Sequence, residues 1–83
     1  MAPEHVEELI RTALPAAEKI LVESTDNVHF ESVVVAECFA DMSRLQRQQR
    51  VYANLKSYIA SGELHALALK TYTPAEWQAQ QVV

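Results

Sequence analysis

The apolar patterning of this chain predicts an α+β fold, a two-layer αββαβα sandwich with a three-stranded mixed sheet. Stretches with helical periodicity and stretches that alternate like strands follow the order helix, strand, strand, helix, strand, helix. Only a short turn separates the first two strands, so they can form a hairpin, whereas the third follows a long helix and can join in parallel. We expect helices on one face of the sheet and one domain, residues 1–83, with a modest core.

The N-terminal half is expected to hold one helix and the hairpin. Pro3 favours the first turn of a helix, and Pro15 ends it. Alternation predicts one strand over residues 19–24 and a second, rich in β-branched side chains, over residues 28–37. Residues 25–27 have the composition of a tight turn.

A long helix is expected to begin the C-terminal half. Ser43 and Gln46 have the spacing of a capping box, so the helix should run over about residues 44–60. Gly62 suits a left-handed cap at its end. The apolar side chains that recur at helical spacing, and should form a buried stripe, are Leu45, Val51, Tyr52, Leu55, Tyr58 and Ile59.

A third strand and a short last helix should complete the fold. Residues 65–72 alternate like a strand, and residues 73–76 form a second capping box with proline at the first helical position. Tyr72 and Trp77 are expected to close the open end of the sheet. Residues 78–83 are expected to form a frayed tail.

Charge is unevenly distributed along the chain. Residues 1–41 hold nine acidic and two basic side chains, residues 42–83 hold two acidic and five basic ones, and the net charge is −4. This separation favours an oriented encounter with a partner. It is not the strongly basic surface of a dedicated nucleic-acid-binding protein.

Composition also bears on the compartment of the protein. No apolar run approaches the roughly 18 residues that a membrane span requires, and the acidic N-terminus lacks the pattern of a signal peptide. The single cysteine, Cys38, excludes an internal disulfide and fits a reducing compartment. We therefore expect a cytoplasmic protein that does not contact membranes.

Candidates for chemistry are few. His65 lies at the start of the third predicted strand and His29 opens the second. Each fits a strand-edge histidine that bonds locally, but a neutral imidazole at the mouth of a strand can also bind a metal. Cys38 is best interpreted as a small buried apolar residue rather than a ligand or nucleophile. Because no phosphate-binding loop, Ser/His/Asp set or HExxH pattern is present, we expect no enzyme.

Three arginines occupy the predicted long helix at spacings of three, on or near one face. Arg44, Arg47 and Arg50 most simply form a solvated helix face, with Arg44 placed next to the Ser43 cap. The alternative is a docking surface for an acidic partner or for phosphates.

The order of several short motifs resembles the BolA family. F-x-x-x-S-R precedes a Gln/Arg-rich helix ending in V-Y, which is followed by L-H-A-L and T-Y-T-P-x-E-W. The series covers about residues 6–77 and is specific, although no single motif is. Met42 and Gln49, with the short N-terminal part, resemble the IbaG-like branch of the family. The matching residues are Phe39, Ser43, Arg44, Val51, Tyr52, His65, Ala66, Thr71, Tyr72, Thr73, Pro74, Glu76 and Trp77.

The resemblance implies a fold similar to class II KH and an adaptor in iron–sulfur trafficking or in iron and stress regulation. In this family the histidine of the L-H-A motif is a ligand offered to a 2Fe–2S cluster shared with a monothiol glutaredoxin, and that role falls on His65. Glutathione supplies a further thiolate. The family's second ligand comes from the loop between the first two strands; residues 24–28 contain neither histidine nor cysteine, so His29 is the nearest candidate. Cys38 alone cannot complete a cluster, so thiolates must come from outside and the free protein is expected to be apo.

The same resemblance supplies an alternative function. Family members have been regarded as DNA-binding transcriptional regulators, which here would use Ser43, Arg44, Arg47 and Arg50. With a single glycine, the chain lacks the GXXG loop by which KH domains hold nucleic acid. A third possibility is a protein–protein module without metal. The sequence leaves open whether the free protein is a monomer or a homodimer.

Overall fold

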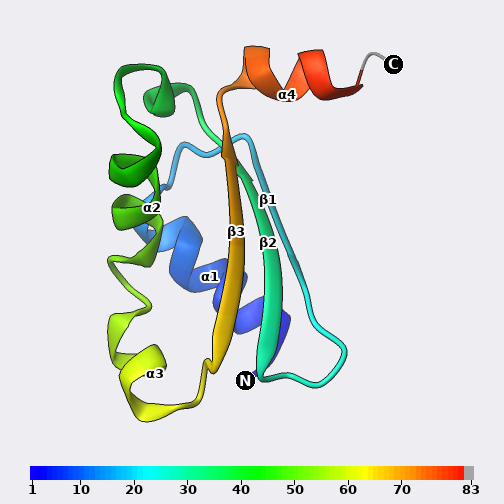
Figure 1. Ribbon diagram of the computed structural model, residues 1–83, viewed down its shortest axis with the longest axis vertical. Helices are drawn as coiled ribbons and strands as arrows, with labels where there is room; N and C mark the ends of the chain where they lie inside the picture. Colours follow the sequence, from blue (N-terminus) through cyan, green and yellow to red (C-terminus); the bar gives the residue numbers. More distant parts are fainter. Residues whose placement is uncertain (82–83) are drawn as a thin grey trace.

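The computed structural model describes residues 1–81, and its elements follow the order that the apolar pattern predicts. The elements are α1 (Pro3–Ala13), β1 (Lys19–Glu23), β2 (His29–Val35), a 3-10 helix η1 (Glu37–Asp41), α2 (Arg44–Tyr52), α3 (Lys56–Ser61), β3 (Ala66–Tyr72) and α4 (Pro74–Gln81). The strands form one sheet in the order β1-β2-β3, in which β1 runs antiparallel and β3 parallel to β2 (Figure 1). The predicted α+β class and mixed sheet are confirmed.

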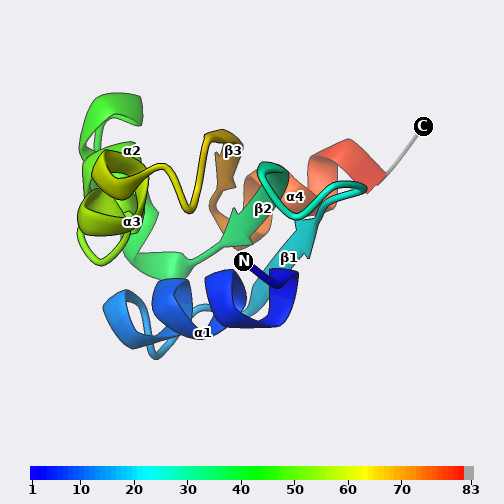
Figure 2. The same cartoon turned by 90° about the horizontal axis from the view of Figure 1, so that it is seen from below.

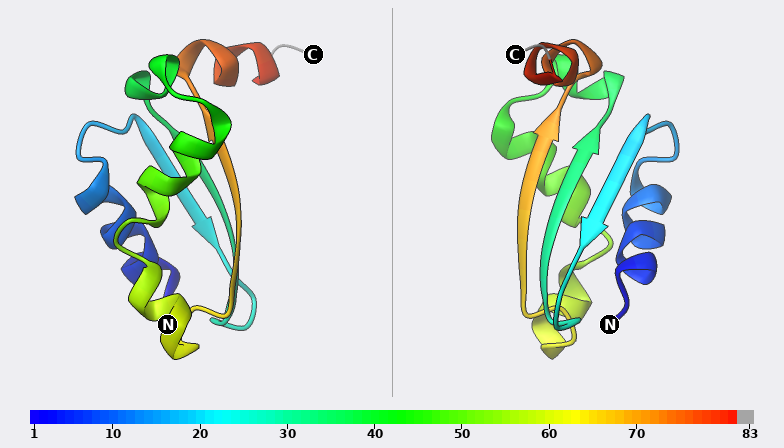
Figure 3. Two further views of the ribbon diagram at one scale, coloured as in Figure 1. Left: turned by 60° about the vertical axis from the view of Figure 1, so that its left-hand side comes forward. Right: turned by 90° about the vertical axis from the view of Figure 1, so that its right-hand side faces the viewer.

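The helices cover one face of the sheet and leave the other open. Seen from below, α1, α2 and α3 lie on the same side of the three strands (Figure 2). Helix α4 lies across the end of the sheet where β2 and β3 finish, and no helix lies in front of the opposite face (Figure 3, right). Within residues 1–81, no helix combines the length and the apolar character needed to cross a membrane.

The core lies between the sheet and its helices. Val6 and Ile10 of α1 are fully buried against the sheet, to which β2 contributes Phe30 and Val34. Burying an aliphatic or aromatic side chain of this size contributes roughly 1.5–3 kcal/mol. The other buried apolar residues are Leu14, Ala17, Ile20, Val35, Ala36, Phe39, Val51, Leu55 and Leu64.

The long helix expected over residues 44–60 is interrupted. Helix α2 ends at Tyr52 and α3 begins at Lys56, with a turn between them. In this turn the side-chain amide of Asn54 donates to the carbonyl of Leu9 at 3.2 Å, and Leu55 is completely buried. The interruption therefore lets Asn54 bond a carbonyl of α1 and lets Leu55 enter the core. Both are tertiary contacts, which the local apolar period does not predict.

The predicted apolar stripe on this segment is only partly correct. Val51 and Leu55 are buried, and Tyr52 donates its hydroxyl to the carbonyl of Leu67 at 3.0 Å. Leu45 is 64% exposed and Ile59 is 40% exposed. Because the turn changes the direction of the chain, one continuous stripe does not exist.

The second strand is shorter than expected, which changes the setting of Cys38. Strand β2 ends at Val35, and residues 37–41 form the 3-10 helix η1. Phe39 is fully buried within η1, whereas Cys38 is exposed. The prediction of a buried apolar Cys38 is wrong, because alternation within a strand does not continue through a 3-10 turn.

The predicted helix ends are confirmed. Ser43 and Gln46 form a reciprocal capping box, with distances of 2.8 and 3.2 Å. Thr73 and Glu76 do the same for α4, with 2.8 and 3.1 Å. Gly62 ends α3 with φ of +84°, a conformation that costs glycine little.

The C-terminal helix is longer than expected. It continues to Gln81, so the frayed tail expected over residues 78–83 is helical over its first four residues, and residues 82–83 lie outside the described part. The rings of Tyr72 and Trp77 meet with centroids 5.5 Å apart at the end of the sheet, as predicted.

Candidate functional site

The two candidate histidines lie side by side at one end of the sheet. His29 is the first residue of β2, and its register partner in the parallel strand is Ala66, the residue after His65. The two imidazole rings meet edge to face, with centroids 5.1 Å apart and planes inclined by 70°. Both residues are exposed, and the side chain of His29 is 60% exposed.

A single carbonyl brings the two strand starts together. The backbone N–H groups of His65 and Ala66 both donate to the carbonyl oxygen of Val28, at 3.0 and 3.2 Å. This fixes the residue before β3 against the residue before β2. The pairing of the two rings is thus a consequence of the parallel register, which joins residues far apart in the sequence.

Asp26 holds the ring of His29. One carboxylate oxygen lies 2.7 Å from Nδ1 of His29, and the other accepts the backbone N–H groups of Val28 and His29 at 3.0 and 2.9 Å. These hydrogen bonds, that of the His29 N–H first, hold the pKa of Asp26 far below its usual range. An ionised Asp26 at Nδ1 favours the tautomer that leaves the Nε2 lone pair of His29 free for a metal.

The turn that carries Asp26 is itself well held. The hydroxyl of Ser24 donates to the carbonyl of His29 at 2.6 Å and accepts the N–H of Asn27 at 2.9 Å. Asn27 has φ of +61°, in the left-handed region that asparagine tolerates, and its carbonyl accepts the terminal amine of Met1 at 3.1 Å. His29 therefore follows a turn that is held by several hydrogen bonds.

Sequence reasoning treated Asp26 only as a turn residue and missed its contact with the imidazole. The signal was present: an aspartate three residues before a histidine at the start of a strand can bond both the turn amides and the ring. The carboxylate does both here.

Two imidazoles are the most that this end of the chain offers a metal. Residues 1–81 contain no group of three or more His, Cys, Asp or Glu side chains placed to hold a metal ion. Cys38 follows the far end of β2, away from His29, and cannot join the pair. The donor set fits a metal centre to which a second molecule supplies the remaining ligands, and it does not fit a centre built by one chain.

The three arginines of α2 do not form one free patch. Arg47 has a side chain only 13% exposed, and its guanidinium contacts both carboxylate oxygens of Glu76, at 2.8 and 3.4 Å. Its Nε donates to the carbonyls of Phe39 and Met42 at 3.1 and 3.3 Å. The expectation of a solvated face is therefore wrong for Arg47, which joins η1, α2 and α4.

The other two arginines, Arg44 and Arg50, lie beside different parts of the surface. Arg44 borders a hollow with Gln48 and Lys70, and Arg50 borders another beside Cys38. Both arginines are exposed. Ser43 uses its hydroxyl to cap α2, so it is already engaged with the backbone of its own helix.

Comparison with known proteins gives one family. Residues 1–76 match the family model described as BolA-like protein. The acid stress protein IbaG of Escherichia coli K12 is 50% identical over 54 residues, which span 65% of this chain and 64% of that protein. The DNA-binding transcriptional regulator BolA of Haemophilus influenzae is 42% identical over 52 residues, which span 63% of this chain and 50% of the regulator.

A solved structure agrees with these relatives. The bolA protein homologue from Coxiella burnetii is 37% identical and superposes with a TM-score of 0.79, covering 94% of this chain and 97% of that one. The relatives carry the names of a stress protein and a regulator rather than of enzymes. The match over residues 1–76, together with the shared fold, shows that this chain belongs to the BolA family.

Proposed function

We propose that this protein is an adaptor that pairs with a monothiol glutaredoxin and contributes imidazole ligands to a shared 2Fe–2S cluster. The observation that carries the proposal is the packing of two exposed imidazole rings, those of His29 and His65, whose centroids lie 5.1 Å apart. Two exposed imidazoles held this close can serve one metal centre. His65 is the ligand implied by the family motif, and His29 becomes the second candidate because it lies beside it.

The thiolates would come from outside the chain. Iron–sulfur clusters are held chiefly by cysteine, and His pairs replace two thiolates in some of them, which raises the reduction potential. The one cysteine of this chain is at the other end of β2. A glutaredoxin cysteine and the thiol of glutathione supply the two sulfur ligands that complete the set.

The chain's own part is to hold its imidazoles in the ligating state. Asp26 retains the proton on Nδ1 of His29 and leaves Nε2 free. The carbonyl of Val28 fixes the backbone of His65 at the same edge. When bound, the cluster would supply the electron or the iron–sulfur unit that is passed on.

The test is to co-express the chain with a monothiol glutaredoxin and to follow visible absorption and circular dichroism of the purified complex. His65→Ala should remove or destabilise the cluster, whereas His5→Ala should not. His5 is the matched control because its ring packs edge-on against Tyr58, with centroids 5.5 Å apart, and not against the pair. An unchanged spectrum with His65→Ala contradicts the ligand role.

Calorimetry without iron separates ligation from docking. If His65→Ala loses the cluster but binds apo-glutaredoxin as the wild type does, the imidazole acts as a ligand. If wild type and variant bind apo-glutaredoxin equally, and the co-expressed wild-type complex also contains no iron, the protein is a metal-free module and the proposal is wrong.

A second candidate function follows from the name of one relative. The Haemophilus influenzae relative is called a DNA-binding transcriptional regulator, and Arg44 and Arg50 are exposed on α2. Arg47 is committed to Glu76, which leaves two of the three cations for phosphates. DNA binding would weaken steeply with salt, by a slope that counts neutralised phosphates, and no gel shift at low salt would exclude this function.

A further inference from the structure

Strand β3 pairs with a neighbouring strand on one side only. In the sheet order β1-β2-β3 its partner is β2. The N–H of Ala66 and the carbonyl of Tyr72 make their bonds on the β2 side. Because the backbone groups of successive strand residues point to alternate sides, every second residue of β3 points its N–H and C=O away from β2. We call these residues the free edge of β3; they are Leu67, Leu69 and Thr71.

Internal hydrogen bonds occupy both ends of the free edge and leave its middle unpaired. The carbonyl of Leu67 accepts the hydroxyl of Tyr52 at 3.0 Å. Beyond the other end, the N–H of Thr73 donates to the capping carboxylate of α4 at 2.8 Å. Within residues 1–81, no group bonds the outward N–H and C=O of Leu69 or Thr71. The edge therefore presents two donors and two acceptors to a partner strand.

A basic hollow separates this part of the edge from α2. Arg44 and Gln48 of α2, with residues 69–72 of β3, line a hollow of about 100 Å³. Arg44 and Lys70 are exposed, and within residues 1–81 no ion pair engages either cation. In a chain with a net charge of −4, two unpaired cations beside the free edge favour an anionic partner.

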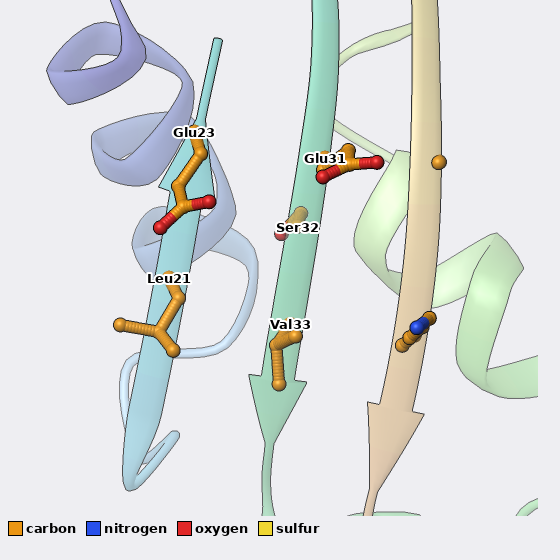
Figure 4. Close-up of a pocket in the computed structure, with 7 residues that line it drawn as sticks. Leu21, Glu23, Glu31, Ser32 and Val33 are labelled. Atoms are coloured by element: carbon orange, nitrogen blue, oxygen red, sulfur yellow. The ribbon is translucent and has the colours of Figure 1, made fainter.

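Lys70 lies on the face of the sheet that the helices leave open. Its register partner in β2 is Val33, and Figure 4 shows the side chain of Val33 on that face together with that of Leu21. Val33 and Lys70 also line the same hollow there. A strand added to the free edge therefore places one of its own side chains on this face, directly opposite Lys70.

A second copy of this chain does not fit the free edge. A two-fold antiparallel pair that joins the unpaired residues of both copies matches Leu69 of each with Thr71 of the other. It sets the two copies of Lys70 directly opposite each other, where like charges are unfavourable. The neighbouring two-fold registers use Leu67 or Thr73, whose carbonyl or N–H is already bonded. The edge therefore favours a partner of opposite charge.

We propose that the free edge of β3 binds an extended acidic segment of another protein as a fourth strand. The backbone of the segment bonds Leu69 and Thr71. An aspartate or glutamate opposite Lys70 is also within reach of Arg44, because both cations border one hollow. In strand addition the main-chain bonds supply affinity and the side-chain contacts supply specificity. A nucleic-acid strand fits less well, because its phosphates carry no donor for the two carbonyls.

The free edge is separate from the histidine pair. His65 precedes the first residue of β3, whereas Leu69 and Thr71 lie in the second half of the strand, toward α4. One partner at the histidines and another at the free edge can therefore bind at the same time. Binding at the edge does not depend on the proposed iron–sulfur function.

Two-dimensional ¹H–¹⁵N NMR of the iron-free chain tests the proposal with short synthetic peptides capped at both ends. A peptide in which threonine alternates with glutamate should shift the amide signals of Leu69 and Thr71 saturably and slow their hydrogen exchange. The same peptide with lysine in place of glutamate should bind about tenfold more weakly, because its contact with Lys70 is repulsive. The glutamate peptide with N-methylated backbone amides should not bind, because it lacks the main-chain donors.

Variants of the chain separate the two contributions. Arg44→Glu/Lys70→Glu should bind the glutamate peptide about tenfold more weakly. Thr71→Pro should lose binding because it removes an outward N–H, and proline is tolerated on an edge strand. Arg11→Glu/Lys56→Glu is the matched control, since it makes the same charge change at exposed residues of α1 and α3; it should bind as the wild type does. Circular dichroism confirms that each variant is folded.

Several results would overturn the proposal. These are the absence of a saturable shift at Leu69 and Thr71, equal binding of the lysine or N-methylated peptide, and undiminished binding by the charge-reversed variant. Shifts of the same two amides that grow with protein concentration, without any peptide, would identify a second copy as the occupant. A single-stranded thymine oligonucleotide that binds these amides more tightly than the glutamate peptide would identify a nucleic acid.

Discussion

Nδ1 of His29 lies 2.7 Å from a carboxylate oxygen of Asp26, while the other oxygen of that carboxylate accepts two backbone N–H groups. The same side chain therefore shapes the turn and orients the imidazole ring through Nδ1. A carboxylate behind an imidazole is a common arrangement at metal sites, where it fixes ring orientation and raises ligand basicity.

Asp26→Asn should weaken ligation more than it weakens the fold. The amide oxygen can still accept the turn N–H groups, but the amide nitrogen donates to Nδ1 and moves the ring proton to Nε2. We expect long-range ¹⁵N NMR to show the changed tautomer of His29, and the cluster-bound fraction to require about tenfold more partner. An unchanged tautomer would contradict this role for Asp26.

Arg47→Ala should destabilise the protein, whereas Arg44→Ala should not. Arg47 loses two hydrogen bonds to carbonyls and its packing on the ring of Phe39, 5.7 Å from its centroid. We expect the free energy of unfolding in urea to fall by about 2 kcal/mol for Arg47→Ala. Arg44 is exposed, so Arg44→Ala should change it by less than about 0.5 kcal/mol. Equal losses of unfolding free energy in the two variants would contradict a stabilising role for the contacts that Arg47 makes with η1 and α4.

Glu76 should make stability depend on pH in the acid range. The Arg47 guanidinium, followed by the backbone N–H of Thr73, holds the pKa of Glu76 below its ordinary value of 4.5. A lowered folded-state pKa stabilises the protein above pH 4.5, and this contribution is lost as the pH falls through the folded-state pKa. The melting temperature of the wild type should exceed that of Glu76→Gln at pH 7, and the difference should vanish on acidification. A difference that persists at low pH, or that Arg47→Ala leaves undiminished, would contradict this cause.

Ser32→Ala should stabilise the fold, in contrast to the same change at Ser24. Ser32 is 3% exposed and its hydroxyl has no partner within residues 1–81. Removing an unsatisfied buried hydroxyl should raise the free energy of unfolding by about 0.5–1 kcal/mol. Ser24→Ala loses bonds to His29 and Asn27 and should lower it by about 1 kcal/mol. Loss of stability in Ser32→Ala would contradict this, because it would mean that the hydroxyl is bonded in solution.

Local signals predicted most of the fold. Apolar period and capping residues are encoded within a few positions, so the strand and helix order and both capping boxes could be predicted. The interruption at residues 53–55 could not, because it depends on Asn54 reaching the carbonyl of Leu9. Cys38 was misplaced because the sequence did not reveal that β2 stops at Val35.

The candidate site was predictable in part. The family motif indicated His65, but the proximity of His29 depends on the parallel register of β2 and β3, which only the folded chain reveals. Arg47 was grouped with its neighbours by spacing alone, and its partner Glu76 lies 29 residues further along the chain. Long-range partners of this kind carry no local pattern.

The central claim is that His29 and His65 together present imidazole nitrogens to one shared cluster. Pulsed electron paramagnetic resonance of the reduced complex tests it most directly, with ¹⁵N-histidine incorporated only into this chain. The claim predicts two coupled ¹⁵N nuclei, one lost in His65→Ala and the other in His29→Ala, and neither in His5→Ala. A reduced cluster with no coupling to ¹⁵N from this chain would contradict it.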